Sequence, residues 1–357
     1  MGGNKIIKEY YPWSKKVLDS ILNAHKAGDL ATLDLELTAQ CSYANCIYCD
    51  SKPVVGKKLN NELPKETIRK LIQDAAKLKC HWIYTCGLGE PLEDDNFWFL
   101  VEEAHKYGIN ISLFTNALLI NKENAKLLKK YGVCLIVKLD TLNSCNFDKI
   151  LNRQGSADKI YQALECLLSE GYGKCEDENI TDIAVSIVPS KLSIDGLEDV
   201  INYAKKNNIF PSIGELEQAG AMLINSKNYS DLALTKEEIQ TIRKQVDILV
   251  ACNYTRPICP TIIAGLHIDV SGNCVVDKKT GLNCKWFLLK EPDIVNLGNI
   301  KDNDLSVLLE KVKKYRAECF TTNKDHIQEL KNIRYEFGGC GGSPHEVVKL
   351  AEKILNE

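Results

Sequence analysis

The sequence lacks the features that would place it in a membrane or on a nucleic acid. No apolar run among its 357 residues reaches the ~20 residues that a membrane-spanning helix needs. The opening Met-Gly-Gly-Asn-Lys-Ile has neither the apolar core of a secretion signal nor a myristoylation pattern. With 45 basic and 48 acidic residues there is no basic excess to bind phosphates. We therefore expect a cytoplasmic protein with no membrane or nucleic-acid partner.

Patterns that predict zinc sites or disulfide frameworks are also scarce. The six histidines show no ligand spacing, and Cys46–Cys49 is the single Cys-x2-Cys pair. Structural zinc usually takes four protein ligands, so a zinc ribbon or finger is disfavoured. The 15 cysteines are odd in number and clustered, and no secretion signal accompanies them. This usage argues against a disulfide framework and fits a reducing compartment.

What the chain does have, from about residue 31, is an alternation of strand-like and helix-like segments. Alternation of this kind predicts a parallel sheet with right-handed crossovers. We expect an α/β fold, a partial (β/α)6 TIM barrel rather than a closed eight-stranded one. One helical segment, 160–168, should be capped by Ser156. The expected strands are 32–38, 81–85, 109–115, 134–139, 182–188 and 210–214.

Three segments make up the expected domain organisation. Residues 1–30 predict a lead-in helix, 31–220 the barrel, and 221–357 a small α+β cluster-binding domain. In the last segment, 266–270 and 274–276 flank Ser-Gly-Asn and predict a β-hairpin. A capping box at Thr235 and Glu238 predicts the start of a helix there.

The most informative motif is Cys41-x4-Cys46-x2-Cys49, directly after the first expected strand. The carboxyl ends of parallel strands form the edge where α/β proteins place their chemistry. Three thiolates this close can hold three irons of a [4Fe–4S] cluster, and no fourth cysteine lies nearby. One iron would then stay open to bind a small molecule. Taken alone, the Cys-x2-Cys pair also fits zinc or a redox dithiol.

Together with Gly87-Leu-Gly89-Glu90-Pro after the second strand, this motif resembles the radical S-adenosylmethionine (SAM) superfamily. The resemblance covers residues 31–220. It implies that the three cysteines bind the cluster, that the open iron binds SAM, and that one electron cleaves SAM to a 5′-deoxyadenosyl radical. Two departures stand out: the first cysteine gap is one residue longer than the usual Cys-x3-Cys, and Leu88 replaces a glycine of the family's Gly-Gly-Glu-Pro element.

The resemblance also implies a set of SAM-binding residues at the strand ends. Glycines let the backbone approach the ligand, and carboxylates accept hydrogen bonds from its ammonium and ribose groups. A guanidinium suits the methionine carboxylate. Thr115 and Asn116 fit a turn cap equally well, and Tyr48 fits simple packing under the loop. The candidates are Tyr48, Gly87, Gly89, Glu90, Thr115, Asn116, Asp140, Arg153 and Ser186.

A second group of cysteines lies near the C-terminus, at Cys252, Cys259, Cys274, Cys284, Cys319 and Cys340. This group resembles the SPASM or shorter twitch extension of radical SAM enzymes, which holds an auxiliary iron–sulfur cluster. The Cys-x2-Cys-x5-Cys-x3-Cys array of a full SPASM domain is absent, so one auxiliary [4Fe–4S] cluster is expected. Structural zinc is the alternative. The preferred ligands are Cys259, Cys274, Cys284 and Cys340, and the less preferred candidates are Cys252 and Cys319.

The function expected from this resemblance is abstraction of hydrogen from a substrate C–H bond, with the auxiliary cluster assisting oxidation or substrate binding. The substrate is a peptide or protein, or a small molecule such as a sugar, an aminocyclitol or a cofactor precursor. A flavodoxin or ferredoxin is the expected reductant. An iron–sulfur or zinc scaffold is the non-catalytic alternative. No catalytic residue is assigned, although Glu215, Glu217 and Asp269 are carboxylates near the expected opening.

Overall fold

The computed structural model describes most of the chain, and contacts divide it into two compact units. The first unit consists of Met1–Ser14, Cys41–Gly56 and Ser112–Thr255. The second consists of Lys15–Gln40, Lys57–Ile111 and Arg256–Glu357. The described residues are 8–42, 45–51, 55–85, 87–214, 216, 219–224, 226–242, 265–283 and 293–323.

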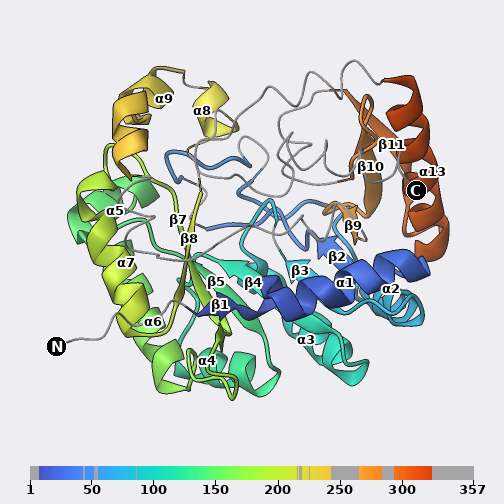
Figure 1. Ribbon diagram of the computed structural model, residues 1–357, viewed down its shortest axis with the longest axis horizontal. Helices are drawn as coiled ribbons and strands as arrows, with labels where there is room; N and C mark the ends of the chain where they lie inside the picture. Colours follow the sequence, from blue (N-terminus) through green and yellow to red (C-terminus); the bar gives the residue numbers. More distant parts are fainter. Residues whose placement is uncertain are drawn as a thin grey trace. The chain divides into compact units, whose positions relative to one another are not determined.

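The first unit is built from parallel strands that alternate with helices (Figure 1). Its strands are β1 (Glu9–Tyr10), most of β4 (Asn110–Thr115), β5 (Cys134–Lys138), β6 (Ile180–Thr181), β7 (Ile183–Ile187) and β8 (Phe210–Ile213). Its helices are α4 (Lys122–Lys130), α5 (Ser144–Leu151), α6 (Ser156–Ser169), α7 (Leu197–Lys206), α8 (Ala221–Ile224) and α9 (Ser226–Leu232), with 3-10 turns at Tyr11–Trp13 and Ile194–Gly196.

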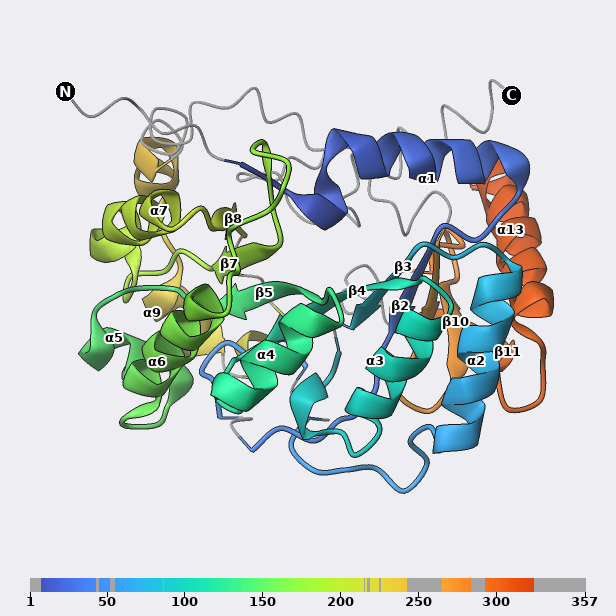
Figure 2. The same cartoon turned by 90° about the horizontal axis from the view of Figure 1, so that it is seen from below.

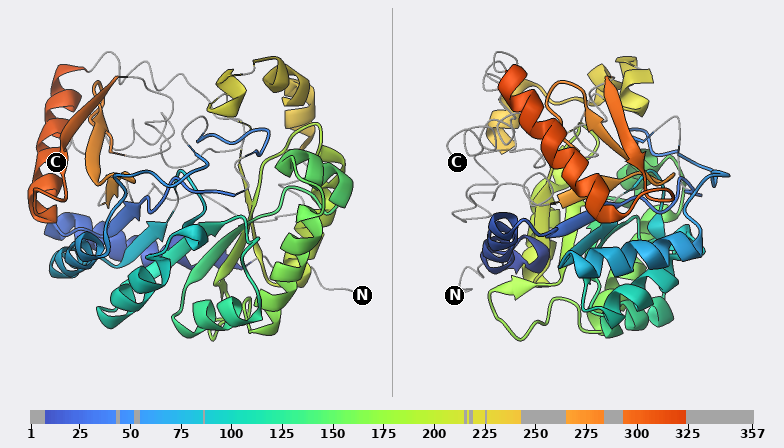
Figure 3. Two further views of the ribbon diagram at one scale, coloured as in Figure 1. Left: turned by 180° about the vertical axis from the view of Figure 1, so that it is seen from behind. Right: turned by 90° about the vertical axis from the view of Figure 1, so that its right-hand side faces the viewer.

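The second unit has the same alternation over its first half and then a smaller β-ribbon. In Figure 2, α2 and α3 lie side by side, and the right-hand view of Figure 3 shows α13 beside β10 and β11. Its elements are α1 (Lys15–Ala27), β2 (Thr32–Leu35), α2 (Lys65–Lys77), β3 (Trp82–Thr85), a 3-10 turn (Pro91–Glu93), α3 (Phe97–Lys106), β9 (Gly265–Ile268), β10 (Asn273–Asp277), β11 (Ile294–Asn299) and α13 (Leu305–Thr322).

Seven strands form the main sheet, in the order β8-β7-β5-β4-β3-β2-β9. The ladders from β4 to β8 and from β3 to β9 are parallel. All six strands expected from the sequence are present within a few residues, which confirms the α/β class and the partial-barrel arrangement. Apart from Phe114, which is partly exposed, the apolar residues of these strands are buried, as parallel sheets covered by helices require.

The expected C-terminal hairpin is wrong in its pairing. The segment at 265–268 joins the main sheet as its seventh strand, parallel to β2. β10 pairs instead with β11 in an antiparallel ribbon. The alternation of apolar and polar residues predicts that a segment is a strand, but it does not specify which strand it pairs with. The sequence pattern therefore predicted the strands but not their partners.

The cap expected at α6 is also wrong. Ser156 is buried inside the first turn, and Gly155 precedes the helix in a left-handed conformation. The carboxylate of Asp148 accepts hydrogen bonds from the amides of Gly155 (2.6 Å) and Ala157 (2.8 Å). The Asp148 carboxylate of α5 therefore accepts hydrogen bonds from amides at the start of α6, a role that was expected of the Ser156 hydroxyl.

None of the described helices combines the length and the apolar character that crossing a bilayer requires.

Candidate active site

The loop that carries the first three cysteines belongs to the first unit. Cys41, Cys46 and Cys49 are each partly exposed. A turn joins the last two, in which the Cys49 amide donates to the Cys46 carbonyl (3.2 Å). The Cys41 amide donates to Gly56 (3.3 Å) and the Ile47 amide to Ile150 at the end of α5 (3.0 Å). The loop is thus fixed at three points, and its thiols remain partly accessible.

A second contact holds the end of this loop against the start of α8. The Ala221 amide donates to the carbonyl of Cys49 (2.9 Å). At Gly220, φ is +49°, and an added Cβ would lie 2.2 Å from the Asp50 oxygen and 2.5 Å from the Cys49 oxygen. Only glycine allows this approach. The sequence analysis did not single out Gly220, because a glycine between two alanines gives no sign of what it packs against.

An ion pair lies under the cysteine loop at the carboxyl end of β5. Lys138 Nζ is 2.8 Å from Asp140 Oδ2, and the Asp140 carboxylate is fully buried. The ammonium also lies 4.6 Å from the ring centroid of Tyr48 and 3.5 Å from its hydroxyl oxygen. Burial, and then the charge of Asp140, raise the pKa of Tyr48 well above its usual range, so this phenol stays protonated. Asp140 therefore acts as the partner of Lys138 and Tyr48.

Other candidates in the first unit lie close to the cysteine loop. Asn116 Nδ2 is 4.0 Å from Cys41 Sγ. Arg153 donates from Nη1 to the carbonyl of Ser42 (3.4 Å). Thr115 Oγ1 accepts from the Ala117 amide and Asn116 Oδ1 from the Leu118 amide, each at 2.9 Å, so both side chains also shape the turn after β4.

Ser186 lies one strand further along the sheet than Lys138. The two are register partners on β7 and β5, and Ser186 is in turn the partner of Ser212 on β8. Register partners in a parallel sheet point to the same face. The three polar side chains, all partly exposed, therefore form a row on one face of the sheet. Ser212 was not predicted as a site residue, because a single serine directly after a proline indicates only the end of a strand.

In the second unit, the Gly-Leu-Gly-Glu-Pro turn packs on the segment that follows β2. The Gly89 amide donates to Thr38 (2.9 Å) and the Glu90 amide to the Gln40 carbonyl (2.8 Å). The Glu90 carboxylate is buried and accepts from the Leu92 amide (3.2 Å). A Cβ on Gly87 would meet Glu36 at an ordinary 3.6 Å. The turn thus holds the residues immediately before Cys41.

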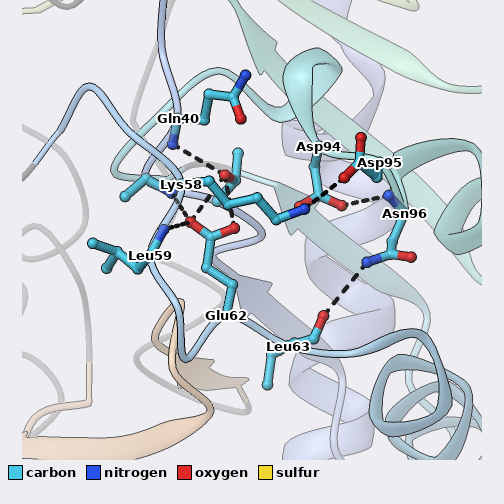
Figure 4. A network of polar contacts seen from close by, with 10 residues as sticks. Gln40, Lys58, Leu59, Glu62, Leu63, Asp94, Asp95 and Asn96 are labelled. Carbon is cyan, nitrogen blue, oxygen red and sulfur yellow. Dashed lines mark hydrogen bonds and ion pairs between the residues drawn. The ribbon is translucent and has the colours of Figure 1, made fainter.

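The same segment is held from its other side by Glu62 (Figure 4). Its carboxylate accepts from the Thr38 hydroxyl (3.0 and 3.1 Å), the Ala39 amide (2.9 Å) and the Leu59 amide (2.8 Å). Hydrogen bonds to a charged acceptor are stronger than neutral ones. Figure 4 also shows Lys58 paired with Asp95 at 2.6 Å. Glu62 was missed from the sequence, where it is one acid in a polar loop.

Comparison with known proteins agrees with this geometry. The family model described as the radical SAM superfamily matches residues 35–185, a span that includes the three cysteines, the glycine turn, and Lys138 with Asp140. Residues 35–185 are a radical SAM domain. The superfamily uses a [4Fe–4S] cluster and SAM.

Two curated relatives carry enzyme names. The mycofactocin maturase MftC of Mycolicibacterium smegmatis is 28% identical over 220 residues, which cover 61% of this chain and 51% of that protein. The chain thus spans about half the length of MftC. A GTP 3′,8-cyclase of Clostridium acetobutylicum is 24% identical over 330 residues, or 86% of this chain and 96% of that protein. The radical SAM domain and these relatives confirm that the chain is an enzyme, with its reaction open.

Solved structures share the fold. Streptococcus suis SuiB bound to S-adenosylmethionine has a TM-score of 0.58 at 14% identity, covering 90% of this chain and 75% of that one. The protein anSMEcpe, with bound AdoMet and Kp18Cys peptide, has a TM-score of 0.59 at 17% identity, covering 91% and 98%.

The donor set of the radical SAM domain fits an iron–sulfur cluster. Cys41, Cys46 and Cys49 supply three partly exposed cysteines on one fixed loop, and thiolate is the ligand that such clusters use. The Lys138 ammonium, 3.5 Å from the hydroxyl oxygen of Tyr48 on this loop, would offset the negative charge that bound thiolates bring. Among the described residues, no three His, Cys, Asp or Glu side chains are grouped to hold a single metal ion.

Only two of the six cysteines proposed for an auxiliary cluster lie within the described residues. Cys274 is buried at the start of β10, and burial raises the pKa of its thiol to about 12. Cys319 is buried in α13, 3.5 Å from the Lys278 carbonyl oxygen. Cys252, Cys259, Cys284 and Cys340 lie outside the described residues.

Of the three carboxylates expected near the opening, the structure describes one. Asp269 accepts from the amides of Ser271 (2.9 Å) and Asn273 (2.8 Å), so it closes the turn before β10. Glu215 and Glu217 lie outside the described residues.

Proposed function

We propose that this enzyme cleaves SAM reductively at a [4Fe–4S] cluster held by Cys41, Cys46 and Cys49, and uses the resulting radical to abstract hydrogen from a substrate C–H bond. The observation that carries the proposal is the fixed three-thiol loop beside the buried Lys138–Asp140 pair. When bound, the cluster supplies the electron that breaks a carbon–sulfur bond of SAM.

The residues of the chain have separate parts in this scheme. Asn116 and Arg153 contact the cysteine loop and would hold polar groups of SAM beside it. Gly89 and Glu90 fix the strand end that leads into Cys41. Ser186 and Ser212 provide hydroxyls on the face shared with Lys138. These residues bind and orient the ligand, which brings the reacting atoms together.

The test is anaerobic reconstitution with iron and sulfide, followed by dithionite and SAM. Release of 5′-deoxyadenosine is expected from the wild type. A Cys46→Ser variant should lose the SAM-binding cluster and that release, whereas Cys145→Ser, which changes an exposed thiol on α5, should retain both. Full iron loading without any 5′-deoxyadenosine would favour the scaffold alternative.

For the substrate, we favour a peptide. MftC is named as a maturase, and anSMEcpe and SuiB are solved with peptides, a Kp18Cys peptide and the precursor peptide SuiA. A nucleotide is the second candidate, because the GTP 3′,8-cyclase relative aligns over 96% of its own length. Addition of GTP, or of short peptides encoded beside the gene, should raise 5′-deoxyadenosine release for one class only.

An auxiliary [4Fe–4S] cluster and a low-potential reductant complete the proposal. The similarity of the fold to SuiB and anSMEcpe extends over about nine-tenths of this chain and supports a cluster in the C-terminal region. Iron analysis should give about eight irons per chain for two clusters, since each holds four. A flavodoxin or ferredoxin should replace dithionite in the assay.

A further inference from the structure

Lys138 is the only charged residue of β5, which otherwise reads Cys-Leu-Ile-Val. Its side chain is 22% exposed, and its Oδ2 partner on Asp140 is fully enclosed. The second oxygen, Oδ1, accepts from the Val188 amide at 2.8 Å. Two opposite charges are therefore fixed in place at the end of the strand, with little water to screen them.

The pair faces the cysteine loop directly. Tyr48, whose ring covers the Lys138 ammonium, stands between Cys46 and Cys49 in the sequence. The Lys138 ammonium lies 4.6 Å from the ring centroid of Tyr48 and 3.5 Å from its hydroxyl oxygen, which places the pair against the turn between the two cysteines. A positive charge fixed there stabilises negative charge that develops on the cysteine loop.

We propose that the Lys138–Asp140 pair sets the reduction potential of the cluster at Cys41, Cys46 and Cys49, with Lys138 raising the potential and Asp140 lowering it. The inference rests on the proposed function. Reduction adds one electron, taken from dithionite or a flavodoxin, to the cluster. A fixed positive charge nearby stabilises that electron, and a fixed negative charge opposes it. Both are positioning residues, since they act through the cluster.

Two substitutions change charge with little change of shape. Asp140→Asn keeps an Oδ1 acceptor for the Val188 amide and removes the negative charge. Lys138→Met keeps an unbranched side chain over Tyr48 and removes the positive charge. Lys138→Arg keeps that charge. The matched control is Lys129→Met, because Lys129 forms an ion pair with Asp182 elsewhere in the first unit.

The experiment is a potentiometric titration followed by electron paramagnetic resonance on anaerobically reconstituted full-length protein, without SAM. Cys274→Ser and Cys319→Ser backgrounds separate the signal of any auxiliary cluster. Lys138→Met should shift the midpoint potential of the SAM-binding cluster to more negative values, and Asp140→Asn to more positive values. Lys138→Arg and Lys129→Met should leave it near that of the wild type.

The outcomes separate the two ideas. If the wild type assembles a cluster that depends on Cys46, but neither charge variant shifts its potential, the inference is overturned and the proposed function stands. Shifts of the same sign in both variants also overturn it. If no such cluster forms, both are overturned. Should Lys138→Met fail to load iron, Asp140→Asn alone decides, because a positive shift is expected from it in any case.

Discussion

A Cβ on Gly89 would lie 2.1 Å from the carbonyl oxygen of Gln40 and 2.8 Å from the carbonyl carbon of Ala39. Both neighbours are backbone atoms of the segment that leads into the cysteine loop, and real side chains never approach so closely. Gly89→Ala should therefore displace that segment and destabilise the protein by about 1–3 kcal/mol, the usual cost of overpacking. Urea unfolding of the apoprotein measures this loss.

Gly87→Ala is the matched control for that change, because its Cβ would make ordinary contacts with Glu36. Its free energy of unfolding should lie within about 0.5 kcal/mol of that of the wild type. If the two variants lose equal free energies of unfolding, the turn needs glycine at both positions for its flexibility, and not for the close approach of Gly89 to Gln40.

Gly220 should be equally intolerant in the first unit. A side chain there would collide with the Asp50 and Cys49 carbonyls and push the third cysteine out of place. We expect Gly220→Ala to lower the iron retained after anaerobic reconstitution and gel filtration. Gly214→Ala, whose Cβ would lie 3.8 Å from the Ile187 oxygen, should retain iron like the wild type. Unchanged iron in Gly220→Ala would contradict this role.

Glu62 should contribute to stability through its accepted hydrogen bonds. Glu62→Ala leaves the Thr38 hydroxyl and the Ala39 and Leu59 amides without this acceptor. The expected loss is about 2 kcal/mol, because hydrogen bonds to a charged group contribute about 1.5–3 kcal/mol. Glu62→Gln keeps one acceptor oxygen and should lose less. Equal unfolding free energies for both variants and the wild type would show that water replaces these bonds.

Asp94 should make stability depend on pH. Burial raises the pKa of its carboxyl to about 6 from an ordinary 3.8, against the lowering effects of the Asn96 amide and Lys58. The folded state thus binds this proton more tightly than the unfolded state, and stability from this group falls as pH rises from about 4 to 6. Asp94→Asn, which keeps an acceptor for the Asn96 amide, should be more stable than the wild type above pH 6.

That advantage should shrink as pH falls through 6 and level off below 3.8, where the wild-type carboxyl is mostly protonated in both states. Urea unfolding at several pH values between these limits and neutrality provides the measurement. A constant difference between the two proteins would mean that Asp94 does not titrate in this range.

The alternation of strands and helices was predictable because it depends on local pattern. Each strand of the first half combines β-branched or long apolar residues that are buried on both faces. The capping box also formed as expected: the Glu238 amide donates to Thr235 Oγ1 (3.2 Å), and the Thr235 amide donates to the Glu238 carboxylate (2.6 Å). These are contacts between neighbours in the chain.

The features that the sequence did not predict depend on contacts between residues far apart in the chain. Asp148, rather than Ser156, satisfies the start of α6 because α5 brings its carboxylate there. Asp140 was predicted as a SAM-binding residue, but its pairing with Lys138 could be recognised only in the structure. Steric demands such as that of Gly220 are invisible until the partner backbone is placed.

The seventh strand has a practical consequence for anyone who shortens this chain. β9 comes from residues 265–268 yet hydrogen-bonds along β2, the strand that leads to the cysteine loop. Removing everything after the sixth strand would leave a row of unpaired amides and carbonyls on β2, and such bare edges recruit other chains. A minimal barrel cut at residue 220 should therefore precipitate, and a fragment for biophysical work has to keep β9.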